Sequence, residues 1–99
     1  MVEWSLPARD DLRAIYEYIA LDSKFYARNT VRNIVERASR GSDTPGIGRV
    51  VPELGEENVR EVFIYSYRII YQIFPDKLTI LAVVHGYRNL QDEDIPVIR

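Results

Sequence analysis

The sequence predicts an α+β domain in which an N-terminal strand and a helical hairpin precede a curved antiparallel sheet. Two stripes with helical spacing occupy the first half of the chain, and three strand-like runs follow one another in the second half. Helices that cluster in the sequence, followed by consecutive β-hairpins, are typical of a sheet with helices segregated to one face. A chain of 99 residues suits one hydrophobic core, so residues 1–99 are expected to form a single domain.

The first half predicts a short strand and two antiparallel helices. Val2 to Ser5 is apolar and contains Trp4, which suits an edge strand. Pro7 suits the first turn of a helix, where its missing N–H leaves no bond unmade. Ser23 is a suitable N-cap for a second helix, and Gly41 a suitable end. Apolar residues recur every three or four positions in both helices, at Ala8, Leu12, Ile15, Tyr16 and Ile19 and at Ala27, Val31, Ile34, Val35 and Ala38.

The second half predicts three antiparallel strands after a loop at Ser42 to Gly48. The expected strands are Val59 to Tyr65, Tyr67 to Phe74 and Leu78 to Tyr87, the last of them central because it is apolar on both faces. A two-residue turn at Tyr65 and Ser66 would pair Arg60 with Tyr71 and Arg68 with Phe63, so the two arginines should lie on opposite faces. We expect Leu12, Ile15, Ile19, Val31, Ile34 and Val35 to be buried against Ile69, Ile73, Ile80 or Ala82. The apolar tail at Ile95 to Ile98 should pack on the sheet or add to its edge.

The composition excludes several classes of function. The formal net charge is −2, so the chain as a whole is not a basic nucleic-acid binder. It contains no Cys and one His, which leaves no disulfide and no plausible metal ligand set, and no cofactor is expected. No apolar run is long enough to span a membrane, and a cytoplasmic protein is the natural interpretation.

Four cationic or titratable side chains lie within or just after the strand-like runs. They are Arg60, Arg68, His85 and Arg88, and antiparallel pairing could bring them to one end of the sheet. Such a cluster binds anions, carboxylates or phosphates. Arginine is well suited to this role because its planar guanidinium forms paired contacts with either group.

Several segments resemble the RelE/ParE superfamily of bacterial toxins from type II toxin–antitoxin operons, and more closely its ParE branch. The resemblance covers essentially the whole chain, and the order and spacing of its segments carry it. Those segments are Trp4 to Ala8 before DLRAIYEYI, GRVVPE at Gly48 to Glu53, REVF at Arg60 to Phe63, YRIIY at Tyr67 to Tyr71 and VVHGYR at Val84 to Arg88.

The resemblance implies a small toxin that a cognate antitoxin neutralises as a hetero-oligomer. ParE-type members inhibit DNA gyrase by binding, which is the function we expect, and an enzymatic activity is not favoured. RelE-type members cleave mRNA in the ribosome, so a metal-independent endoribonuclease is the first alternative. A module that binds an antitoxin but is no longer toxic is the second.

The candidate site residues differ between these functions. For ribonuclease activity, Glu53 would act as base and His85 as acid, with Arg60 and Arg68 stabilising charge on the phosphate. The segment His85-Gly86-Tyr87-Arg88 and the net acidity favour the ParE branch instead. The residues expected to bind a target are Arg49, Arg60, Arg68, His85, Tyr87 and Arg88.

Overall fold

The computed structural model describes the backbone of residues 1–99 and the side chains of all of them except Ser42. A short strand, β1 (Val2–Trp4), leads into two antiparallel helices, α1 (Leu6–Ala20) and α2 (Lys24–Ser39). Four strands follow, and short 3-10 turns lie at Arg40–Ser42, Pro45–Ile47 and Asp92–Asp94. The strands are β2 (Arg49–Val50), β3 (Val59–Ile64), β4 (Tyr67–Ile73) and β5 (Leu78–His85).

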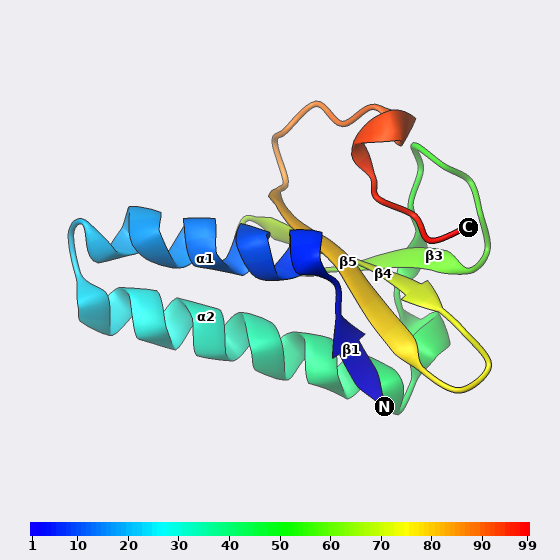
Figure 1. Cartoon of the computed structure of the whole chain (residues 1–99), viewed down its shortest axis with the longest axis horizontal. Helices are drawn as coiled ribbons and strands as arrows, with labels where there is room; N and C mark the ends of the chain where they lie inside the picture. Colours follow the sequence, from blue (N-terminus) through cyan, green and yellow to red (C-terminus); the bar gives the residue numbers. More distant parts are fainter.

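The strands form one five-stranded sheet in the order β1-β5-β4-β3-β2. The pairs β5–β4, β4–β3 and β3–β2 are antiparallel, whereas β1 joins the free edge of β5 in parallel. The predicted α+β class with an N-terminal strand and a helical hairpin is therefore confirmed, and the parallel β1 makes the sheet mixed. Figure 1 shows the hairpin packed against the sheet at one end and extending well beyond it at the other.

Local signals position both helices. The Ser5 side chain accepts a hydrogen bond from the Ala8 N–H and caps α1, with Pro7 in its first turn. The Ser23 side chain caps α2 in the same way by accepting from the Tyr26 N–H, as predicted. The second helix ends at Ser39, two residues before the predicted end at Gly41. Neither helix is long and apolar enough to cross a bilayer, and the same holds for every helix in the described part of the chain.

The predicted register of the first β-hairpin is confirmed. Arg60 pairs with Tyr71 and Arg68 with Phe63, around a two-residue turn in which Tyr65 has a positive φ of 54°. The strand β5 differs from strict alternation, because its register against β4 shifts between Ile70 and Tyr71. Leu81 is the extra residue of this bulge, so Leu81 and Ala82 both lie on the face away from the helices.

The core on the helical face is centred on Ile34, which is fully buried among residues of β3, β4 and β5. The prediction was right for Ile34, Ile69 and Ile80. It was wrong for Ala82, which the bulge turns to the other face. Leu12 and Ile15 are half-buried and pack against this core together with Ile73 of β4, in line with the prediction. The other predicted helix residues, Ile19, Val31 and Val35, are also only half-buried.

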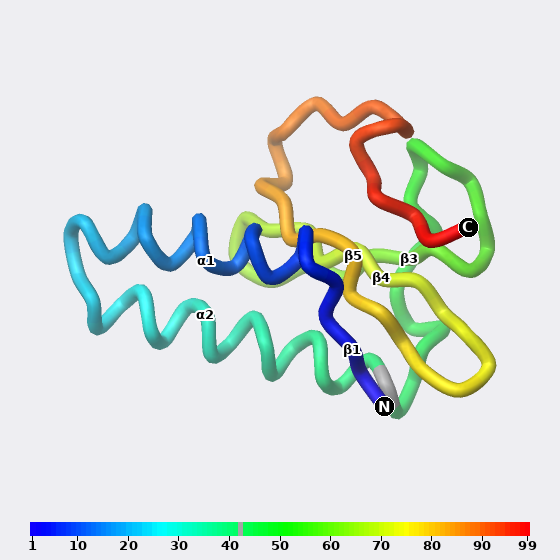
Figure 2. The backbone as a smooth tube through the Cα atoms, viewed as in Figure 1, coloured from blue at the N-terminus to red at the C-terminus, as the bar shows by residue number. Residues whose placement is uncertain are grey.

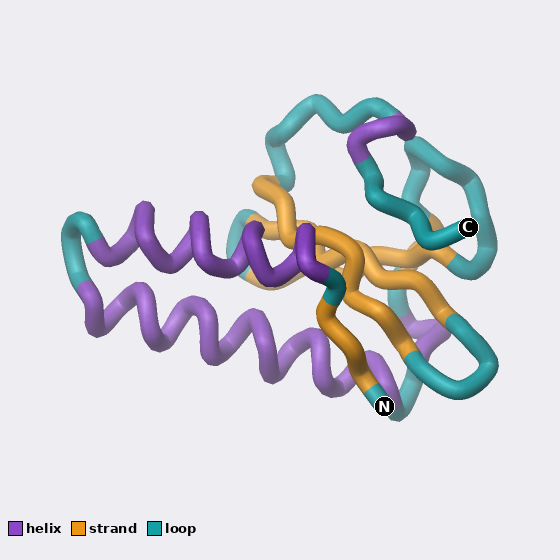
Figure 3. The backbone as a smooth tube through the Cα atoms, viewed as in Figure 1, coloured by secondary structure: helices purple, strands orange, loops and turns teal.

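The C-terminal tail covers the sheet face opposite the helices, so the expectation that its apolar residues pack on the sheet is confirmed. Leu90 and Ile95 are buried there with Val51 and Leu81. The Gln72 side chain fixes the end of the tail, donating to the Ile98 carbonyl and accepting from its N–H, both at 2.9 Å. Figure 2 shows the tail running beside the segment that joins β2 to β3, and Figure 3 shows that both are mostly irregular.

Candidate functional site

Four charged side chains form a linear network on the sheet face away from the helices. Arg68 makes two parallel hydrogen bonds to the Glu53 carboxylate, at 2.9 and 2.8 Å. The Arg68 Nε donates to Glu61 Oε1 at 2.6 Å, and Arg49 Nε donates to Glu61 Oε2 at 2.5 Å. Glu61 is only 1% exposed and Arg68 only 5%. The network therefore joins two carboxylates and two guanidiniums with no net charge.

Three strands and one turn bring this network together. Arg49 pairs with Glu61 across β2 and β3, while Arg68 lies on β4. Glu53 reaches Arg68 from the turn after β2, in which the Leu54 and Gly55 N–H groups donate to the Val51 carbonyl. This turn folds Glu53 back over the sheet, where it covers the outer side of the Arg68 guanidinium.

The ion pairs shift the titration of both partners. The hydrogen bonds from Arg68 hold the pKa of Glu53 below its ordinary value of 4.5. The same contact, opposed by burial, raises the pKa of Arg68 above its ordinary value. Both groups are therefore charged at neutral pH and directed toward each other.

Acidification should weaken the fold through Glu53. A carboxyl group with a lowered pKa binds its proton less tightly in the folded chain than in the unfolded chain, so its stabilising contribution is present above about pH 4.5 and is lost as the pH falls below that value. Urea unfolding of the wild type and Glu53→Gln at about pH 7 and about pH 3.5 measures this contribution. We expect the variant to be less stable at neutral pH and the difference to shrink at low pH. An equal difference at both pH values would contradict this assignment.

Arg60 lies on the other face of the sheet and binds carbonyl groups of the loop before β2. Its guanidinium donates to the carbonyls of Glu57 and Gly48, each at 3.0 Å, and to the Glu57 carboxylate at 2.9 Å. The paired residue Tyr71 donates to the Pro45 carbonyl at 2.6 Å and accepts from the Gly48 N–H. A Cβ at Gly48 would lie 2.7 Å from the Glu61 carbonyl oxygen, so only glycine fits here.

His85 ends β5 on the helical face and belongs to an aromatic cluster. Its ring lies edge-on to Tyr67, with centroids 5.8 Å apart, and 5.3 Å from the ring of Tyr87. Tyr87 is 87% exposed, and Arg88 beside it is exposed as well. His85 and Tyr67 also line an open groove of about 400 Å³ along α1, together with Ala14, Ile15, Tyr18 and Val83.

Asp11 borders the same end of the sheet. Its carboxylate accepts a hydrogen bond from the Val83 N–H at 2.9 Å. This bond satisfies a backbone donor of β5 beyond the point where β1 ends. Partial burial raises the pKa of this carboxyl group above its ordinary value, although the Val83 N–H and the Arg88 charge both act in the opposite direction. Asp11 therefore lies close enough to Arg88 for the two charges to interact.

The structure separates the residues proposed for ribonuclease activity. Adjacent strand residues point to opposite faces, so Arg68 and Tyr67 lie on different sides of β4, and His85 lies with Tyr67. Glu53 is held by Arg68 on the side away from His85. Glu53 and Arg68 thus come together, whereas His85 and Arg60 do not join them.

Sequence comparison places the chain in a family. The family model described as the ParE toxin of the type II toxin–antitoxin system, parDE, matches residues 2–90. The chain belongs to the ParE toxin family. The match includes every strand and both helices of the ParE-family chain, and it ends just before the tail that covers the sheet.

Solved structures show the same fold in distant proteins. The chromosomal ParDE toxin–antitoxin system from P. aeruginosa is similar to this ParE-family chain with a TM-score of 0.71 and 23% identity, covering 85% of this chain and 92% of that one. The toxin–antitoxin complex RelBE2 from Mycobacterium tuberculosis gives a TM-score of 0.61 and 23% identity, covering 86% and 95%. No curated protein sequence matches the chain.

Sequence reasoning missed two residues that organise the site. Glu61 is not among the candidate residues identified from the sequence, yet it is the buried centre of the network. Its position between Val59 and Phe63 on one face of β3 was a usable signal, since a charge on a largely apolar face requires a partner. Asp11 carried no such signal, because it lies among other charged residues of α1.

Proposed function

We propose that this ParE-family chain is a toxin that inhibits DNA gyrase by binding it, and that a cognate antitoxin neutralises it. Membership of the ParE toxin family supports the toxin role. The observation that favours binding over RNA cleavage is the separation of Glu53 from His85 by the sheet. General acid–base catalysis without a metal needs both groups within about 3 Å of the protons that they transfer.

The state of Glu53 also argues against a role as base. Its two oxygens are occupied by Arg68, and the pKa of its carboxyl group is lowered, which makes it a weaker base. Arg68 in turn is bound to Glu61, and Arg60 to Glu57. These arginines are unavailable to a phosphate unless the internal ion pairs break.

The exposed residues among the binding candidates are Arg49, which also pairs with Glu61, and His85, Tyr87 and Arg88. Tyr87 and Arg88 are exposed two and three residues after the end of β5, and the Tyr87 ring lies next to that of His85. Arg49 is exposed over the ring of Phe63, 5.2 Å from its centroid. We propose that Tyr87 and Arg88 contact gyrase, because a planar aromatic group beside an arginine is typical of residues that dominate interfaces.

The proposed antitoxin contact is the apolar groove along α1 that Tyr18, Tyr67 and Val83 line. An amphipathic segment that folds on binding suits a groove of this kind. Both similar solved structures are described as toxin–antitoxin systems, which supports a hetero-oligomer of this sort for the present chain. The proposed target and partner also imply a cytoplasmic location, with residues 1–99 acting as one domain.

Induced expression in susceptible bacteria separates the two mechanisms. We expect His85→Ala to remain toxic, because the imidazole is not needed as an acid, and the double variant Tyr87→Ala with Arg88→Ala to lose most of its toxicity. Co-expressed antitoxin should restore growth in each toxic strain. Purified chain should inhibit DNA supercoiling by gyrase, with the same ranking of variants.

Cleavage of mRNA on the ribosome that is abolished by His85→Ala would favour the endoribonuclease instead. A wild-type chain that is folded, binds the antitoxin and leaves growth and supercoiling unchanged would indicate the non-toxic module. Asn89→Ala, which removes another exposed side chain next to Arg88, is the matched control and should behave as wild type.

A further inference from the structure

The cations of this chain are used differently in its two halves. From residue 49 onward, ion pairs engage five of the six cations: Arg49, Arg60, Arg68, Lys77 and Arg99. Within the described residues, no ion pair engages a cation of the helical half, namely Arg9, Arg13, Lys24, Arg28, Arg32, Arg37 and Arg40. The positive charge of the hairpin is therefore available to an outside partner.

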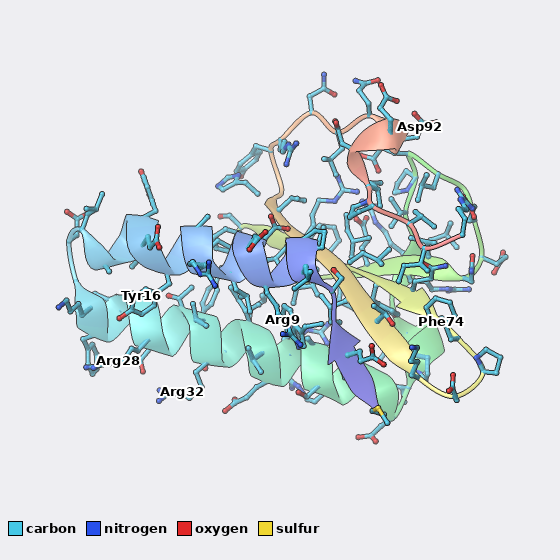
Figure 4. The ribbon with its side chains drawn as sticks, viewed as in Figure 1. Arg9, Tyr16, Arg28, Arg32, Phe74 and Asp92 are labelled. Atoms are coloured by element: carbon cyan, nitrogen blue, oxygen red, sulfur yellow. The ribbon has the colours of Figure 1, made fainter. Side chains whose placement is uncertain are left out.

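This free charge is concentrated on α2. The helix carries four basic residues and one acidic residue, a balance of +3 in a chain whose total is −2. Lys24, Arg28 and Arg32 are four residues apart, which places them on one side of the helix, each about 6 Å further along it. All three are exposed, and we call them the basic ridge. Figure 4 shows Arg28 and Arg32 projecting from α2 on the side away from α1.

An exposed aromatic ring lies at the start of the basic ridge. Phe25 is 63% exposed and precedes Arg28 by three residues and Arg32 by seven, so it shares their side of the helix. Its neighbour Tyr26 is also largely exposed and meets the Phe25 ring edge-on, with centroids 5.7 Å apart. Phe25 thus lies at the start of the basic ridge, with the Tyr26 ring in contact with its own.

We infer that the basic ridge and Phe25 bind single-stranded nucleic acid, with phosphates on the cations and a base stacked on the ring. Arginine and lysine on a continuous track supply affinity for the backbone without reading sequence. Aromatic rings beside such a track are the usual stacking platforms for unpaired bases. The basic ridge ends at Glu36, the one acid of the helix, which limits the contact to about three phosphates. This activity is separate from gyrase inhibition and does not require it.

Fluorescence anisotropy tests the inference with the full chain and a labelled 20-nucleotide DNA strand. Binding should fall in the range of about 10⁻⁴–10⁻⁶ M and weaken with salt, with a logarithmic slope of about −2 for three phosphates. Arg28→Gln with Arg32→Gln should reduce that slope by about 1.4. Phe25→Ala should weaken binding roughly tenfold with little change in the slope.

Arg9→Gln with Arg13→Gln is the matched control, because it removes the same charge from exposed, unpaired residues of α1. The control should keep the wild-type slope and affinity, and circular dichroism should show that all variants are folded. Tighter binding of a 20-base-pair duplex, equal losses in the control, or no binding of DNA at low salt would each overturn the inference. If the chain binds no DNA at low salt, an acidic protein partner would be the alternative explanation of the basic ridge.

Discussion

Replacing Glu61 by glutamine should lower the free energy of unfolding by about 3–5 kcal/mol. The carboxylate is 1% exposed and accepts from both Arg68 and Arg49. An amide keeps the shape but removes the charge and turns one acceptor into a donor, which would point at a guanidinium. Arg68, itself buried, would then hold only Glu53. Urea unfolding at neutral pH measures the loss.

Glu57→Gln is the matched control, since Glu57 pairs with Arg60 through an exposed carboxylate. That change should alter stability by no more than about 1 kcal/mol. A second variant tests the cause of the loss at Glu61. Glu61→Met combined with Arg68→Met removes both buried charges, and stability should recover most of the loss if an uncompensated charge is responsible. A Glu61→Gln variant as stable as the control would refute the role of Glu61 as the centre of the network.

Ile34→Ala should lower the free energy of unfolding by about 2–5 kcal/mol. Ile34 is fully buried where α2 crosses the sheet, and it is surrounded by residues of both helices and of β3, β4 and β5. Removing its side chain leaves a cavity that the rigid sheet cannot fill by collapse. Chemical denaturation with circular dichroism detection measures the change.

Val35→Ala is the control for this prediction, because Val35 neighbours Ile34 on the same helix but is only half-buried. Its loss should be clearly smaller, since less apolar surface leaves the core. Equal losses at both positions would mean that burial against the sheet does not determine the cost, since replacement of Ile or Val by Ala raises helix propensity.

Contacts close in the sequence were predictable in detail. The Ser23 cap and the register that pairs Arg60 with Tyr71 both follow from a few adjacent residues. The turn at Tyr65 and Ser66 fixes every later pair in the hairpin, because a one-residue slip would turn the apolar set to the wrong face. The helical stripes predicted which sides of α1 and α2 face inward. They did not predict how far the hairpin extends beyond the sheet, which left Ile19 and Val31 half-buried.

The candidate site was predicted less completely. The sequence identified Arg49, Arg68 and Glu53 as residues of interest, and the opposite faces of Arg60 and Arg68 followed from alternation along the strands. The buried network around Glu61 depends on β2, β3, β4 and a turn meeting at one place. A strand of two residues such as β2 is too short to leave a periodic signal.

The sequence by itself determined the order of elements, the hairpin register and the family, because each depends on neighbouring residues or on the spacing of segments along the chain. Only the tertiary structure decided which charges are free. It pairs Glu53 with Arg68 on the sheet face away from the helices and places His85 on the helical face. It also covers the face away from the helices with the C-terminal tail, which Gln72 holds in place. Among the described residues, it forms no ion pair with the cations of α2. These outcomes depend on contacts between residues that are far apart in the chain. The strength of a charge–charge contact depends on the distance between the charges and on their burial, and the spacing of residues along the sequence specifies neither.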